Sequence, residues 1–124
     1  MGALNDSASE RLGIGGASGA DPRFAVLAVS GELDLGTADL LWPHLELALV
    51  SGPAEVVVLD ATDLEFIDSS GLRVLLRAAR IAHGDPRSAA FRVVAPHPVV
   101  QRVLDFSGAR QALDVRDSVA EALR

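Results

Sequence analysis

The chain has 124 residues, of which 49% are hydrophobic and 23% are charged, and its formal net charge is −6. This length corresponds to one domain with enough apolar residues to build a core. The negative charge argues against a nucleic-acid-binding protein. Because cysteine is absent, disulfides and thiolate metal sites are excluded. All eleven basic residues are arginines, which excludes P-loop and Schiff-base enzymes, since both need a lysine.

Residues 1–22 are rich in glycine and serine and predict a flexible leader. Leu12 and Ile14 are the only part of it that we expect to form structure, as a short edge strand. The N-terminus lacks the basic region and apolar segment of a signal peptide. No apolar run approaches the ~20 residues of a membrane span. We therefore expect a cytoplasmic protein that does not bind membranes.

Residues 24–29 predict a strand that ends at Ser30-Gly31, so that Asp34 follows at its carboxyl end. From turn chemistry alone, a local turn-forming carboxylate and a site residue are equally good interpretations of Asp34. Thr37 is the expected N-cap of a helix that runs to about residue 50. Pro43 either bends this helix or marks where its regular part begins. We interpret Trp42 as a partly buried packing residue rather than a binding anchor.

The centre of the chain predicts a buried strand over residues 56–59, a polar loop over residues 60–65, and a helix from Ser69 to about residue 83. Either Asp68 or Ser69 is placed to cap this helix. At least one serine hydroxyl then lies at a helix N-terminus, outside the end of a buried strand. Open α/β sheets usually carry their functional groups at that place.

Arginines recur along the outer face of the same helix at positions i, i+4 and i+7, namely Arg73, Arg77 and Arg80. A solvated helix face is the favoured interpretation of this spacing. The functional alternative is a stripe that contacts an acidic patch on a partner.

The rest of the chain predicts a strand over residues 89–94, a helix from Pro98 to the stop at Gly108, a short strand over residues 113–115 and a last helix capped by Ser118. In the helix from Pro98, four residues are expected to face the core: Val99, Val100, Val103 and Leu104. Strands and helices thus alternate, which predicts an α/β domain with a mostly parallel sheet and about four helices.

Three segments carry a resemblance to a known family. Asp68-Ser69-Ser70-Gly71-Leu72, preceded by Phe66-Ile67, resembles the phosphorylation-site signature of the STAS-domain anti-sigma factor antagonists, also called anti-anti-sigma factors. Gly31-Glu32-Leu33-Asp34 is similar to the strand-end motif of this family, and residues 103–108 are similar to its late helix. The matches fall in the family's order and extend from residue 24 to the C-terminus. They imply a STAS-like mixed sheet over residues 23–124, with the helices concentrated on one face, after the leader of residues 1–22.

The resemblance also implies a function in bacterial transcription regulation by partner switching. The unphosphorylated protein is expected to bind an anti-sigma factor with serine kinase activity and so to release a sigma factor. Phosphorylation of Ser69, or in second place of Ser70, is expected to switch this binding off, and a PP2C-type serine phosphatase to restore it. The implied partner-binding residues are Asp34, Asp68, Ser69, Ser70, Gly71 and Arg73. The protein is then a phosphoprotein and not an enzyme, with no cofactor, no metal and no direct contact to nucleic acid.

Other functions remain as alternatives. A STAS domain can also serve as a scaffold outside a sigma pathway, as in stressosomes or lipid-transport complexes. A serine hydrolase is disfavoured because Ser69 is not in a Gly-x-Ser-x-Gly turn. A Mg²⁺-dependent phosphate-accepting aspartate, built from Asp34, Asp60 and Asp68, is disfavoured by the missing lysine. The three histidines are scattered, which disfavours zinc, and nothing in the pattern specifies an oligomeric state.

Overall fold

The structure, a computed structural model, describes residues 10–17 and 21–124. In chain order its elements are β1(Leu12–Ala17), β2(Phe24–Leu33), α2(Ala38–Glu46), the π-helical turn η1(Leu47–Ser51), β3(Val56–Ile67), α3(Ser69–Gly84), β4(Ala90–Val94), α4(Pro98–Ser107), α5(Ala109–Ala112), β5(Val115–Arg116) and α6(Val119–Ala122).

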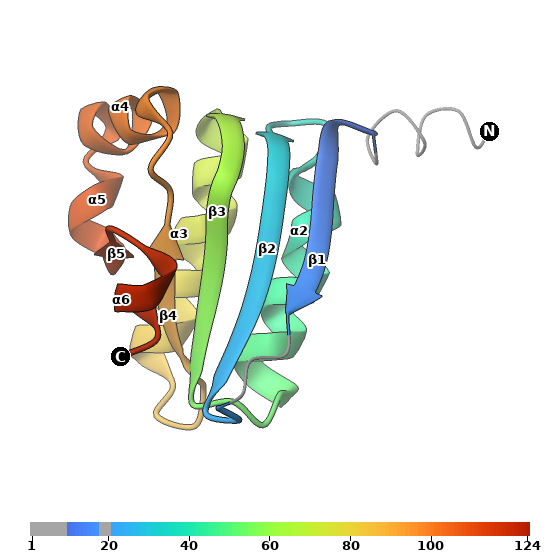
Figure 1. Ribbon diagram of the computed structural model, residues 1–124, viewed down its shortest axis with the longest axis vertical. Coiled ribbons are helices and arrows are strands. Elements are labelled where there is room, and N and C mark those ends of the chain that lie inside the picture. Colours follow the sequence, from blue (N-terminus) through green and yellow to red (C-terminus); the bar gives the residue numbers. More distant parts are fainter. Residues whose placement is uncertain (1–9, 18–20) are drawn as a thin grey trace.

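Five strands form one sheet in the order β1-β2-β3-β4-β5 (Figure 1). The strands β2 to β5 are parallel, and β1 pairs antiparallel with β2 at the edge. This arrangement confirms the predicted α/β domain with a mostly parallel mixed sheet. The edge strand expected around Leu12 and Ile14 is present as β1. Residues 1–9 and 18–20 of the predicted leader lie outside the described residues.

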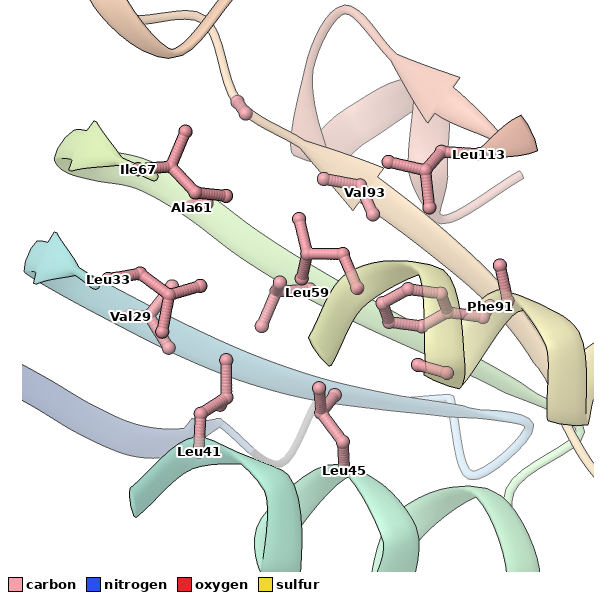
Figure 2. Packing of buried hydrophobic residues seen from close by; sticks show 14 of the residues in the cluster. Val29, Leu33, Leu41, Leu45, Leu59, Ala61, Ile67, Phe91, Val93 and Leu113 are labelled. Carbon is pink, nitrogen blue, oxygen red and sulfur yellow. The ribbon is translucent and has the colours of Figure 1, made fainter. Parts of the chain in front are cut away.

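The main core lies between the sheet and the helices α2 and α3, which both cover its rear face in Figure 1. In Figure 2, Leu41 and Leu45 of α2 point toward the sheet, where Val29 and Leu59 meet them. A smaller cluster on the opposite face packs α6 against β3 and β4. The two long central helices therefore share one face, as the resemblance implies, while the short α6 covers part of the other.

The predicted polar loop over residues 60–65 is wrong, because β3 continues without a break to Ile67. This half of β3 pairs with the end of β2, where two register shifts place extra residues on β3. As a consequence its buried residues, Ala61, Leu64 and Ile67, are spaced by three instead of two. A search for alternating apolar residues misses a strand of this kind.

The turn after β2 also differs from the prediction. β2 runs past residue 29 to Leu33, with a positive φ of 93° at Gly31. Thr37 is the N-cap residue of α2, as predicted, but its side chain makes no capping hydrogen bond to the helix. Its hydroxyl instead accepts a hydrogen bond from the backbone N–H of Asp34 (2.9 Å) and donates one to the carbonyl of Glu32 (2.8 Å). The helix begins at Ala38 and passes through Pro43.

The C-terminal third follows the predicted order with small changes. Pro98 opens α4, and Gly108 ends it with a φ of 77°. Val99 does not face the core as expected, since it is 38% exposed. The last strand, β5, begins two residues later than predicted and ends at Arg116, and an unpredicted helical turn, α5, follows Gly108.

Candidate functional site

The site predicted from the sequence lies at one end of the sheet, where β2 and β3 finish and α3 begins (the upper end in Figure 1). Asp34 follows β2 directly, and Asp68 follows β3. The two strands are paired up to Leu33 and Ile67, so the segments after them start side by side. The fold therefore brings Asp34, Asp68 and the two serines together at neighbouring strand ends.

Asp68 is the N-cap of α3 and also holds the neighbouring loop. Its Oδ1 accepts hydrogen bonds from the backbone N–H groups of Ser70 (2.8 Å) and Gly71 (3.1 Å). Its Oδ2 accepts a third from the N–H of Leu35, in the loop after β2 (3.1 Å). Of the two predicted caps, Asp68 is thus the one in use. A single carboxylate fixes both the first turn of the helix and the loop beside it.

The two serines differ in their accessibility. Ser69 is the first residue of α3 and is exposed, whereas Ser70 is half-buried. Within residues 10–17 and 21–124, the Ser69 hydroxyl has no hydrogen-bond partner. The α3 N-terminus tolerates added negative charge at this position, because the helix dipole and its free N–H groups favour anions. An accessible, unbonded hydroxyl at such a place can accept a phosphoryl group without disturbing the core.

Asp34 is neutralised from within the chain. Its Oδ2 pairs with the guanidinium of Arg11, which comes from the residue before β1, and its Oδ1 accepts from the N–H of Gly36 (2.9 Å). The hydrogen bond from Arg11 is the largest of the effects that lower the pKa of Asp34. Arg11 was not predicted as a site residue, because the resemblance begins only at residue 24. Asp34 therefore adds less negative charge to the site than its position alone suggests.

Gly71 has a packing role. It is buried, and an added Cβ would lie 2.6 Å from the carbonyl oxygen of Leu33 and 2.7 Å from Cγ1 of Ile67. The absence of a side chain lets the first turn of α3 approach the ends of β2 and β3. Gly71 thus acts on the site by setting the position of the helix rather than by offering a surface.

A surface groove of about 340 Å³ lies beside the serines, between α2 and α3. The guanidinium of Arg77 lies over the ring of Trp42, 4.1 Å from its centre. Trp42 is half-buried and packs against the core, so it has the predicted packing role as well as this exposed contact. Leu35 was not predicted as a site residue; in the structure it lines the groove and is 80% exposed. The residues that line the groove are Leu35, Ala38, Asp39, Trp42, Ser70, Arg73, Val74 and Arg77.

The residues needed by the metal-dependent alternative are not gathered. Across residues 10–17 and 21–124, no three His, Asp or Glu side chains are close enough to hold a metal ion together. Asp60 lies on β3 and bonds locally, accepting from the N–H of Thr62 (3.1 Å).

In the same described part of the chain, no helix has the length and apolar character needed to cross a membrane.

Comparison with known proteins agrees with this arrangement. The profile of the STAS domain matches residues 19–122. The chain belongs to the STAS domain family. The anti-sigma F factor antagonist of Paenibacillus polymyxa is 32% identical to it over 98 residues, which cover 79% of this chain and 82% of that relative. The recognised family is therefore the one that the motif at Asp68-Ser69-Ser70-Gly71 indicates.

Solved structures share the fold of this STAS domain. The crystal structure of an anti-sigma factor antagonist from Mycobacterium paratuberculosis aligns with a TM-score of 0.75 at 25% identity, covering 90% of this chain and 91% of that chain. The Bacillus cell fate determinant SpoIIAA, in its phosphorylated form, aligns with a TM-score of 0.64 at 19% identity, covering 90% and 99%. The STAS fold predicted from the resemblance is confirmed, and the proteins from Paenibacillus polymyxa and Mycobacterium paratuberculosis are both named anti-sigma factor antagonists.

Proposed function

We propose that this STAS domain is an anti-sigma factor antagonist whose binding is switched by phosphorylation of Ser69. The unphosphorylated protein binds an anti-sigma factor that is also a serine kinase, and this binding releases a sigma factor in the cytoplasm. A PP2C-type phosphatase removes the phosphate and restores binding. The relatives support the binding role, and the observation that carries the switch is the exposed, unbonded hydroxyl of Ser69 at the start of α3.

The same geometry supports Ser69 over Ser70 as the phosphate acceptor. A kinase must reach the hydroxyl oxygen and align it with the γ-phosphate of ATP. Ser69 is exposed on the first turn of α3, while Ser70 is half-buried and lines the groove. We therefore assign the modification to Ser69.

The switch works through charge at the binding surface and needs no change of fold. A phosphate adds about −1.5 to −2 charges. Asp68 already carries a negative charge next to Ser69, and its three hydrogen bonds come from neutral backbone N–H groups. A partner fitted to a neutral hydroxyl would have to bury an unpaired dianion, which costs several kcal/mol. This is enough to abolish binding.

The test is phosphorylation by a purified anti-sigma factor kinase from the same genome with ATP, followed by peptide mass spectrometry. We expect one phosphate on Ser69 in the wild type and in Ser70→Ala, and none in Ser69→Ala. Phosphate on Ser70 alone would move the site by one residue. No phosphate on either serine with any such kinase would leave a STAS scaffold outside a sigma pathway.

A further inference from the structure

The arginines of α3 differ from most others in this acidic protein. Six of the eleven arginines lie within 4.0 Å of a carboxylate: Arg11, Arg23, Arg87, Arg92, Arg110 and Arg116. Considering the described residues only, Arg73, Arg77 and Arg80 of α3 have no such acidic partner, and neither do Arg102 and Arg124. Acidic residues outnumber basic ones seventeen to eleven, so three unpaired arginines on one helix face are an unusual concentration of positive charge.

Two of these arginines border the groove between α2 and α3. The guanidinium carbon of Arg77 lies over the ring of Trp42, and among the described residues no carboxylate pairs with its N–H groups, so they remain available for an acceptor. Arg73 lies one turn before it and is exposed. Among the described residues, Asp39 is the only acidic one that lines the groove, and the remaining walls include the apolar Leu35, Trp42 and Val74. The groove thus combines two guanidinium groups with apolar surface.

We propose that this groove receives an acidic segment of the anti-sigma factor. Aspartate or glutamate side chains of that segment pair with Arg73 and Arg77, and an adjoining apolar side chain packs on Leu35 and Trp42. This inference rests on the proposed function and extends it to the chemistry of the partner. The groove is continuous with the switch, since Ser70 lines it and follows Ser69 directly. A partner that covers Ser69 therefore reaches the groove.

Charge selects a short acidic segment over other anions. The net charge of −6 repels an extended polyanion such as nucleic acid. A protein segment with one or two carboxylates needs only the local field of the arginines, and bidentate pairing with guanidinium gives it a defined orientation. The apolar walls are matched by a peptide and would remain uncovered by a small inorganic anion.

The first test measures the affinity of the anti-sigma factor kinase that phosphorylates Ser69, by titration calorimetry. We expect Arg73→Glu and Arg77→Glu each to weaken binding at least tenfold. Arg102→Glu is the matched control, because Arg102 is also exposed and unpaired but lies on α4; it should change the affinity less than twofold. Raising the salt concentration from 0.05 to 0.3 M should weaken the wild type more than either α3 variant. Circular dichroism confirms that each variant is folded.

The second test observes the groove directly, in protein that carries no substitution. Trp42 is the only tryptophan, so 5-fluorotryptophan gives one ¹⁹F resonance that reports on the groove. We expect this resonance to shift when the unlabelled kinase binds. This inference would be overturned if the resonance stayed unchanged at saturation and Arg77→Glu bound the kinase as tightly as the wild type. If Ser69→Asp still failed to bind in that case, the proposed function would remain intact. Failure of the wild type to bind any such kinase would overturn both.

Discussion

At the scale of single residues, the candidate site depends on one carboxylate and one missing side chain. Asp68 accepts three backbone hydrogen bonds and so links α3 to the loop after β2. Gly71 lets the same turn of α3 approach Leu33 and Ile67. Both residues act on the position of Ser69 without contacting its hydroxyl. Ser69, which we propose as the switch residue, is therefore positioned by its neighbours, and in the described residues its own hydroxyl makes no hydrogen bond.

Replacement of Asp68 should destabilise the fold measurably. Asp68→Ala removes the N-cap and the bond to Leu35, and we expect it to lower the free energy of unfolding by about 1–2 kcal/mol in urea titrations. Ser69→Ala removes no hydrogen bond found in the described residues and should cost less than about 0.5 kcal/mol. Equal losses for the two variants would contradict the assignment of Asp68 as the cap.

Gly71→Ala should destabilise although alanine is the better helix former. The new methyl group would meet the carbonyl of Leu33 at 2.6 Å, and we expect a loss of about 1–3 kcal/mol from this overpacking. The matched control is Gly84→Ala at the other end of α3, where an added Cβ has nothing within 4 Å. That variant should be neutral or more stable by up to about 1 kcal/mol in the same thermal or urea unfolding experiment.

The ion pair between Arg11 and Asp34 should appear in the pH dependence of stability. Because Arg11 lowers the pKa of Asp34 in the folded protein, the pair contributes stability above the unfolded-state pKa of about 3.8. This contribution is lost as the pH falls through the lower, folded-state pKa. In Arg11→Gln the loss of stability between pH 6 and pH 3 should be smaller than in the wild type. An identical pH profile for both proteins would show that the pair is not formed in solution.

At the scale of elements, the sequence predicted α3 well because several signals agree there. A capping residue, an apolar stripe and the stop at Gly84-Asp85-Pro86 all indicate the same helix. The second half of β3 was predicted wrongly because the extra residues paired against β2 disrupt the alternation on which strand prediction depends. The positions of Asp68 and Ser69 at the start of α3 were still predicted correctly, since the cap marks the start of the helix independently of how the strand ends.

Arg11 and the α2–α3 groove show where sequence reasoning stops. The contact between Arg11 and Asp34 spans 23 positions and comes from outside the recognised motifs. The stacking of Arg77 on Trp42 joins two helices separated by the whole of β3. Both depend on how distant segments pack, and neither has a local signal in the sequence.

Hydrogen exchange tests the assignment of the sheet. The residues 57–59 of β3 are fully buried and pair with both β2 and β4, so their amides should be among the slowest to exchange. Amides in residues 61–67 should also be protected wherever they pair with β2. If these residues formed a loop, their amides would exchange fast. Fast exchange over residues 57–59 would contradict the architecture.

At the scale of the whole molecule, the fold places the proposed switch residue, Ser69, at one end of the sheet. The core lies between the sheet and the helices α2 and α3, away from the exposed Ser69. We therefore expect phosphorylation of Ser69 to alter the charge of a surface and to leave the packing unchanged. The account predicts nearly the same melting temperature for the phosphorylated and unphosphorylated proteins, in contrast to a large change in partner affinity.

The most direct test of this claim is the affinity of the anti-sigma factor for the two forms, measured by calorimetry on protein carrying phosphate only on Ser69. We predict that phosphorylation weakens binding by a factor of ten or more, equivalent to at least ~1.4 kcal/mol, while the melting temperatures stay within a few degrees. Equal affinities for the two forms would contradict the proposed switch.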